Sequence, residues 1–255
     1  MPERIQSVER AATILRLLAS GSRQLGVVEL AHAMNLPKGT VHGLLQTLQY
    51  VGFVEQIGAG GKYRLGPTLL HLGNVYLDVN ELRSRALSWA DSLATRSGES
   101  VRIGTVHENK VLVIHHVFRP DDSLQVLEVG TLLPLHASAL GKTLLGFDLR
   151  GNILADSIDL PGKTPATVIR RDELLQQINL IRAEGWAMDR DELVHGEASI
   201  AAPIHDERNL TVGAIAITGA IERVCDEDRQ PRRDLVAAVR ETARSISRSL
   251  GAPTW

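Results

Sequence analysis

The chain has 255 residues and lacks several features on which common protein classes depend. Its single cysteine, Cys225, excludes an intramolecular disulfide framework and a cysteine-rich zinc finger. No apolar run approaches the ~18 residues that a membrane span needs, and the first residues lack the apolar stretch of a signal peptide. We find no low-complexity segment and no internal repeat. These absences predict a soluble, cytoplasmic protein that has no membrane partner.

Strong net charge is also missing. The chain has 28 basic and 30 acidic residues, and a net charge of −2 argues on its own against a nucleic-acid binder. The charge is, however, unevenly distributed. Residues 1–66 hold seven basic and four acidic residues, a net charge of +3, and the remainder holds 21 basic and 26 acidic residues. This asymmetry predicts two domains with different partners.

The first 66 residues predict three helices and a hairpin. Apolar residues at three- and four-residue spacing predict a helix over 5–19, ended by Gly21-Ser22, and a short helix at about 27–34. Asn35-Leu36 suits a tight turn, Pro37 suits the first turn of a third helix that runs to about Val51, and Gly52 suits its end. Residues 53–57 and 62–65 then predict strands around Gly58-Ala-Gly-Gly61. This order is that of a winged helix-turn-helix domain.

The third helix has the pattern of a DNA-reading helix, with one apolar face and one short polar face. Gln46 can pair with an adenine edge, and Lys38 and Thr40 suit contacts to phosphates or bases. The predicted DNA contacts are Lys38, Gly39, Thr40, His42, Gly43 and Gln46 on the helix, and Lys62 and Arg64 on the wing. The alternative is a small helical domain with a solvated polar face. The two glycines cost about 1 kcal/mol each in a helix; they suit a closely approaching DNA backbone, or are neutral surface choices.

Beyond Gly66-Pro67, a predicted domain boundary, strands and helices mix. Two helical stretches come first, and the second ends at Gly98. Strands are then predicted over 101–106, 111–117, 124–129, 199–205 and 211–218, and helices over 137–147, 172–183 and about 235–250. Because hairpins of adjacent strands are segregated from helices, the fold class is α+β with an antiparallel sheet.

Five stretches in register resemble the IclR family of bacterial transcription regulators. They are Ile5-Gln-Ser-Val-Glu-Arg-Ala11, Leu36-Pro-Lys-Gly-Thr-Val-His42, Tyr63-Arg-Leu-Gly-Pro67, Leu133-Pro-Leu-His-Ala-Ser-Ala-Leu-Gly-Lys142 and Ala201-Ala-Pro-Ile204. The resemblance implies a winged helix-turn-helix domain over 1–66, a linker helix over 67–80 and a GAF-like effector-binding domain over 81–255. It also implies double-stranded DNA with a palindromic operator as partner, and a homodimer or a dimer of dimers.

The resemblance further implies an effector pocket for a small molecule. It assigns apolar walls and a few polar groups, a composition that suits a polyol. The implied lining is Gln125, Leu133, Ser138, Ala139, Leu140, Asp189, Ser199, Ala216 and Thr218. Alternatively, Ser138 and Ser199 are only helix-start or strand-surface residues and Asp189 is a turn residue. This lining has no Arg or Lys, which favours an uncharged ligand, although N–H groups near residues 137–141 could serve a phosphate.

Within the family, stretches such as His115-His-Val-Phe-Arg-Pro-Asp-Asp-Ser123 and Gln125-Val-Leu-Glu-Val-Gly130 are similar to members that control glycerol use. Those members also share Gly39 and Gly43, where most of the family has Ser and Arg. The resemblance therefore implies repression of a glycerol operon, relieved by glycerol or glycerol 3-phosphate. The alternative within the family is a pathway for aromatic or small organic acids.

An enzyme on a GAF-like fold is the rival class, and the sequence offers no coherent catalytic site. The stretch 136–143 differs from a P-loop at His136, where the pattern needs glycine. His115 and His116 are neighbours in a predicted strand and cannot share a metal. Asp189, Asp191 and Glu192 have the pattern of a solvated turn. We therefore predict no catalytic residue, no metal and no cofactor.

Overall fold

The computed structural model describes residues 5–20, 23–58, 61–78, 80–121, 123–148 and 151–253. It divides into two compact units, Met1–Val79 and Asn80–Trp255, which are described separately. No described helix is both long enough and apolar enough to span a bilayer. The first unit contains α1 (Gln6–Ala19), α2 (Val27–Met34), α3 (Lys38–Tyr50), β1 (Val54–Gln56), β2 (Tyr63–Leu65) and α4 (Pro67–Asp78).

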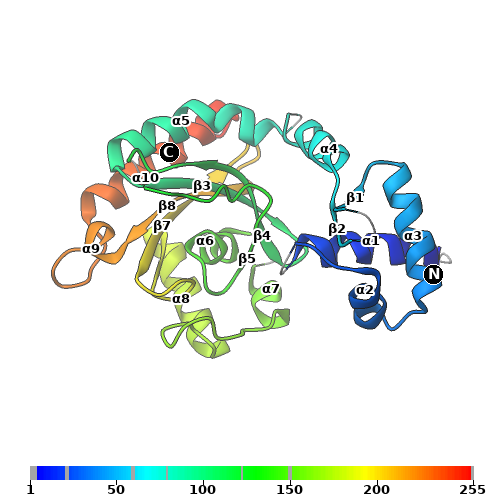
Figure 1. The fold of residues 1–255 in the computed structure, drawn as a ribbon. Helices are drawn as coiled ribbons and strands as arrows, with labels where there is room; N and C mark the ends of the chain where they lie inside the picture. The colour runs from blue at the N-terminus through cyan, green and yellow to red at the C-terminus, as the bar shows by residue number, and fades with distance from the viewer. Residues whose placement is uncertain are drawn as a thin grey trace. The chain divides into compact units, whose positions relative to one another are not determined.

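The first unit is a winged helix-turn-helix (Figure 1). Its small core is formed by apolar residues of α1, α2 and α3 together with Val54 and Tyr63 of the hairpin. The hairpin strands are antiparallel, with Val54 opposite Leu65. Leu25 adds a bridge to Tyr63, which ties the segment before α2 to the wing.

The predicted turn chemistry is confirmed in this unit. Asn35 ends α2 with a φ of 49°, and Gly52 follows α3 with a φ of 76°. These left-handed conformations suit asparagine and glycine. Pro37 lies one position earlier than predicted, at the N-cap of α3. Gly21-Ser22, the predicted end of the first helix, lies outside the described residues, as do two residues of the wing turn.

The second unit is an antiparallel sheet with helices on both faces. The sheet order is β5-β4-β3-β8-β7-β6. Helices α5 and α10 pack on one face, and α6 packs on the other (Figure 1). The elements are α5 (Glu81–Ser97), β3 (Ser100–His107), β4 (Lys110–Val117), β5 (Leu132–Pro134), α6 (Ala139–Phe147), α7 (Gly151–Ser157), α8 (Arg171–Glu184), β6 (Ala187–Arg190), β7 (Glu197–His205), β8 (Thr211–Ala220), α9 (Ile221–Val224) and α10 (Arg233–Ser249). The α+β prediction with an antiparallel sheet is confirmed.

One predicted strand is wrong. Residues 124–129 form no strand, and Leu124 and Val126 are exposed. The chain rejoins the sheet only at Gly130, whose N–H donates to the Val113 carbonyl, and β5 follows. The alternating apolar residues over 124–129 therefore lie on a loop and not in a strand. The prediction also missed the short elements β6, α7 and α9.

Helix α6 is buried from Ala139 to Gly146 because it lies between the sheet and α8. Its glycines allow this close packing. A Cβ on Gly141 would lie 2.4 Å from the Cα of Leu135, and one on Gly146 would lie 2.9 Å from Ile181. The start of α6 is thus held directly against the sheet.

Candidate functional site

The outward face of α3 is the candidate DNA interface. Val41, Leu45 and Leu48 are buried in the core of the first unit. The opposite face is exposed at Lys38, Gly39, His42, Gly43 and Gln46, and Thr40 is half-buried. The structure therefore places the predicted helix contacts together on one solvent-facing surface.

Packing within the chain does not require the two glycines of α3. A Cβ added at Gly39 or at Gly43 would meet no heavy atom within 4 Å. Since glycine is unfavourable inside a helix, the bare surface at these two positions has no explanation inside the described unit. Both alternatives from the sequence, a closely approaching partner and a neutral surface choice, are compatible with this open space.

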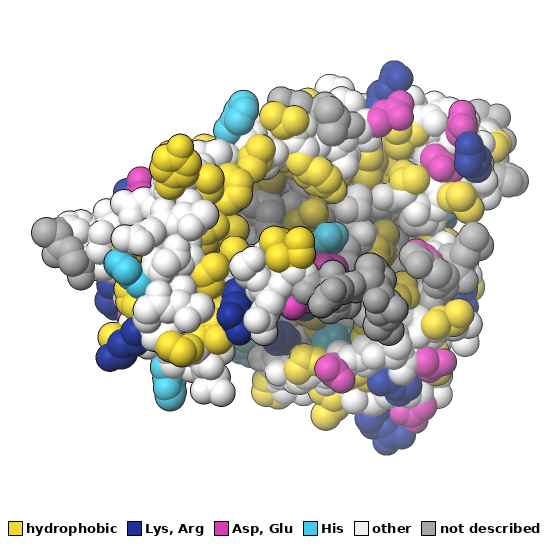
Figure 2. All heavy atoms as spheres, turned by 90° about the vertical axis from the view of Figure 1, so that its right-hand side faces the viewer, with side chains coloured by type: hydrophobic (Ala, Val, Ile, Leu, Met, Phe, Trp, Pro, Cys, Tyr) yellow, Lys and Arg dark blue, Asp and Glu magenta, His cyan; other side chains and the backbone are white. Residues whose placement is uncertain are grey.

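The wing carries its two predicted basic residues in ion pairs. The Lys62 Nζ lies 3.6 Å from a carboxylate oxygen of Glu29, and Arg64 pairs with Glu55 across the hairpin. All four side chains are about half exposed, so these pairs are weak in water. On the face drawn in Figure 2, basic side chains form separate groups and apolar side chains lie among them. The two ion pairs therefore leave the cations of the wing partly neutralised.

The candidate effector pocket is built on a row of cross-strand neighbours. Asp189 on β6 is opposite Ser199 on β7, and Ser199 is opposite Thr218 on β8. Opposite residues of an antiparallel pair share a face of the sheet, so the three polar side chains converge. The Ser199 and Thr218 hydroxyl oxygens are 2.9 Å apart and hydrogen-bonded. Ala216, two residues before Thr218, faces the same side.

The start of α6 closes the other side of this pocket. Ser138 is the N-cap and accepts a hydrogen bond from the Gly141 N–H at 3.1 Å. The Asp189 carboxylate accepts from the Ala139 N–H at 3.0 Å. These two N–H groups, which the sequence offered to a phosphate, are therefore already satisfied by protein side chains. Asp189 is 2% exposed, which shows that assigning it to a solvated turn is wrong.

Burial governs the chemistry of Asp189. Loss of solvent raises the pKa of its carboxyl to about 7, and the Ala139 N–H and the nearby Lys142 only partly oppose this rise. Near neutral pH the group is therefore present in both protonation states, and it can accept or donate a hydrogen bond. Asp191 instead occupies the turn, with a φ of 61° and a hydrogen bond from the Gly196 N–H.

The pocket has a cavity of about 10 Å³, roughly the space of one water molecule. Eight of the nine residues predicted to line it do so. The two lining residues that sequence reasoning missed are Arg102 and Leu193. The expectation of a lining without Arg or Lys is wrong because Arg102 on β3 stands opposite Ala216 on β8. In the sequence, Arg102 stands out as the one charged residue among the apolar neighbours at 101–104, and this pattern could have identified it.

Arg102 also separates this cavity from a larger open pocket of about 460 Å³. Its guanidinium donates to Glu128 at 2.8 Å and to the Thr218 hydroxyl at 3.4 Å. Arg102 and Thr218 line both cavities. The remaining predicted residue, Gln125, lines the outer pocket only, and its amide holds the Arg119 backbone through two hydrogen bonds.

His116 contributes an unused donor to the outer pocket. Its Nδ1 accepts from the Glu128 N–H at 3.2 Å, so a neutral ring carries its proton on Nε2. That Nε2 is buried and has no partner within the described residues. Burial, followed by the charges of Arg102 and His115, lowers the pKa of His116 to about 4. The ring is therefore neutral near pH 7.

Lys142 of the P-loop-like stretch is buried and pairs with Glu192, so it is not directed at a ligand. Among the residues that the structure describes, no group of three or more His, Cys, Asp or Glu side chains could hold a metal.

The fold and these sites define a winged helix-turn-helix regulator of transcription with a separate effector domain. The chain belongs to the IclR family. The IclR helix-turn-helix domain matches residues 7–58, and the bacterial transcriptional regulator IclR C-terminal domain matches residues 74–248. The members of this family are regulators of transcription, not enzymes.

Curated relatives match over nearly the whole chain. The glycerol operon regulatory protein of Streptomyces coelicolor is 54% identical over 252 residues, covering 99% of each chain. That of Streptomyces griseus is 51% identical over 255 residues, again covering 99% of each. Among solved structures, an IclR homologue from Microbacterium hydrocarbonoxydans complexed with 4-hydroxybenzoate has a TM-score of 0.78 at 23% identity. It covers 96% of this chain and 99% of its own, and it shares the fold.

Proposed function

We propose that this regulator represses genes of glycerol use and that glycerol 3-phosphate is its effector. The names and high identity of the Streptomyces relatives support the pathway. The observation that supports this choice of ligand is the position of Arg102, a buried cation on the wall of a hydroxyl-lined pocket. A polyol alone needs no cation, whereas a phosphate is well matched by a guanidinium. As a regulator of transcription, the protein acts in the cytoplasm.

The pocket offers complementary groups to both ends of this ligand. The phosphate takes the place of Glu128 on Arg102 and accepts from the free Nε2–H of His116. The glycerol hydroxyls pair with Ser199, Thr218 and Asp189. Because Asp189 has a pKa near 7, it is partly neutral and does not strongly repel the phosphate.

Ligand entry requires the site to open. The inner cavity holds about one water, so glycerol 3-phosphate fits only when Arg102 turns away from Glu128 and joins the inner and outer cavities. Burial raises the pKa of Glu128 even though Arg102 lies beside it, so the carboxylate is poorly solvated where it stands. A ligand that binds only the opened arrangement shifts the protein toward it.

DNA contact is proposed for α3 and the wing, through the residues predicted above, on a palindromic operator. Dimerisation is proposed through α4. Its Leu72, Val75 and Tyr76 are 49%, 49% and 52% exposed, an apolar surface that a partner helix would cover. Two copies present two α3 helices to two half-sites.

Isothermal titration of the full chain tests the ligand. We expect glycerol 3-phosphate to bind, and the paired variant Arg102→Gln/Glu128→Gln to weaken it at least about tenfold, since a charge-assisted contact contributes ~1.5–3 kcal/mol. The pair is changed together so that no buried carboxylate is left alone. Arg85→Gln, exposed on α5, is the control and should bind normally. Binding of 4-hydroxybenzoate alone, or equal affinity in the paired variant, would contradict the assignment.

A further inference from the structure

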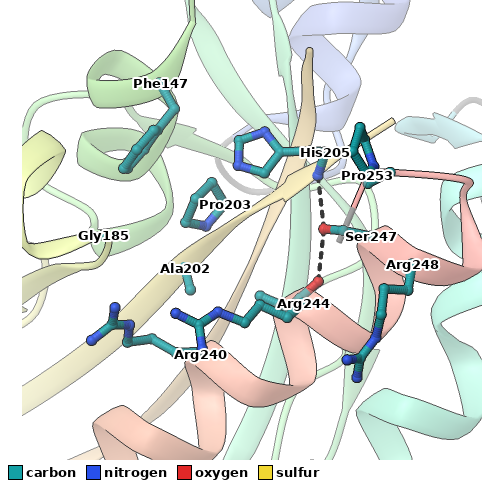
Figure 3. A pocket seen from close by; sticks show the side chains of 12 residues that line it. Phe147, Gly185, Ala202, Pro203, His205, Arg240, Arg244, Ser247, Arg248 and Pro253 are labelled. Atoms are coloured by element: carbon teal, nitrogen blue, oxygen red, sulfur yellow. Dashed lines mark hydrogen bonds between the residues drawn. The ribbon is translucent and has the colours of Figure 1, made fainter. Parts of the chain in front are cut away.

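A second pocket lies between α10 and β7, and the ends of α6 and α8 also line it. It has a volume of about 290 Å³, at the lower end for small-molecule sites. Figure 3 shows Arg240, Arg244 and Arg248 along α10, with Phe147 and Pro203 above Arg240 and Arg244. The pocket is thus cationic on one side and apolar on the other.

The arginines follow a spacing of four residues and so share one face of α10. Like charges at this spacing repel each other and destabilise the helix. The lining contains no Asp or Glu. Neither Arg240 nor Arg244 makes an ion pair or a side-chain hydrogen bond within the described ranges, and Arg248 donates only to the neutral Ser245 hydroxyl. The positive charge here is uncompensated by the described chain.

The walls of the pocket are fixed in place. The Ser247 hydroxyl accepts from the His205 N–H at 2.9 Å and donates to the Ala243 carbonyl at 2.8 Å, which ties β7 to α10. His205 and Phe147 stack edge to face with centroids 6.1 Å apart. Arg240 lies over Gly185 at the end of α8, where a cation also complements the helix dipole. Neither Arg244 nor Arg248 is placed at the end of another described helix in this way.

We propose that this pocket is a second ligand site, which binds a small organic phosphate with an apolar body. The arginines contact the phosphate with paired N–H donors, and Phe147, Pro203 and Ala202 cover the apolar part. The site differs from the effector pocket in position and residues. Both pockets take lining residues from α6 and β7, but no described residue lines both.

Titration calorimetry with phenyl phosphate tests this site in the full chain. We expect phenyl phosphate to bind more tightly than inorganic phosphate because the apolar wall contributes. Arg244→Gln/Arg248→Gln should weaken phenyl phosphate at least about tenfold. Two variants should bind as the wild type does: Arg233→Gln, a matched change on the same helix outside the pocket, and Arg102→Gln/Glu128→Gln in the effector site.

Thermal melting and size-exclusion chromatography accompany the titration. Unchanged melting in Arg244→Gln/Arg248→Gln together with lost affinity supports the site. Equal affinity in that variant overturns it, and so does loss of phenyl phosphate binding in the effector-site variant, since the ligand would then occupy the other pocket. A changed oligomeric state without a changed affinity also overturns it, because the arginines would then serve a protein interface.

Discussion

At the scale of single residues, the protonation of Asp189 links burial to ligand recognition. The carboxyl is held by the Ala139 N–H at the start of α6 and lies beside Ser199 on the neighbouring strand. Removing water costs its charged form more than these contacts return, and the pKa rises to about 7. The same carboxyl in an unfolded chain has its ordinary pKa near 3.8.

This difference makes stability depend on pH with a definite sign. Between about pH 4 and pH 7 the native state holds a proton on Asp189 that the unfolded state has released, so stability falls as pH rises through this window. Above pH 7 both states are ionised and the loss is complete. Asp189→Asn removes the titration. Relative to this variant, the wild type should lose on the order of a few kcal/mol across the window.

Urea unfolding at stepped pH measures the effect. The three tryptophans, Trp89, Trp186 and Trp255, all belong to the second unit, so tryptophan fluorescence follows the unit that contains Asp189. Parallel curves of stability against pH for the wild type and Asp189→Asn would show that the carboxyl does not titrate in this range.

Sequence alone predicted most of the residues that line the candidate effector pocket, and it missed the arginine among them. Ser138, Asp189, Ser199 and Thr218 followed from resemblance, and the structure brings them together. Arg102 was missed because pairing between β3 and β8 decides which side chains join Ala216, and this pairing is a long-range property of the sheet. Burial of Asp189 was missed for the same reason, since its local sequence is that of a turn.

At the scale of elements, the basic residues of the wing are held in ion pairs, which a count of charged residues does not reveal. The net charge of +3 for residues 1–66 says nothing of position, and both wing cations face carboxylates, Lys62 that of Glu29 and Arg64 that of Glu55. The register of the hairpin places Glu55 opposite Arg64. The wing therefore offers DNA cations whose charge is partly neutralised.

Releasing Arg64 should strengthen DNA binding. Glu55→Gln removes the opposing carboxylate, and we expect operator affinity to rise several-fold and the slope of log affinity against log salt to steepen by up to about one unit. Arg64→Gln should do the reverse. Fluorescence anisotropy at several salt concentrations measures both. Glu81→Gln, which breaks a comparable exposed pair with Arg85 on α5, is the matched control. Identical slopes in all four proteins would place the wing away from DNA.

The elements themselves were predicted where pattern and local chemistry agree. Helices α3, α5, α8 and α10 and the hairpins β3–β4 and β7–β8 were placed to within a few residues. The segment 124–129 failed because its alternating apolar residues face solvent on a loop held by Gln125 and by the Glu128 N–H. A four-residue edge strand such as β6 is too short to show a clear alternation of apolar and polar residues. It can be predicted only once its neighbour β7 is known.

At the scale of the whole molecule, a net charge of −2 is the sum of two units with different tasks. The first unit carries a modest positive charge, and two glycines lie on the exposed face of the helix proposed to contact DNA. One such unit should bind DNA weakly, and a dimer through α4 would double the basic surface. The second unit holds a nearly closed ligand pocket whose arginine is paired to a carboxylate. On the proposed function, ligand binding alters the wall around Arg102 before it alters DNA binding.

Operator binding with and without glycerol 3-phosphate tests the central claim most directly. Fluorescence anisotropy of the palindromic operator is measured for the wild type and for Arg102→Gln/Glu128→Gln. We predict that the ligand weakens operator binding of the wild type at least about tenfold, a coupling free energy of ~1.4 kcal/mol, and leaves the variant unchanged. An operator affinity that does not respond to bound ligand, or an equal response in the variant, would contradict the account.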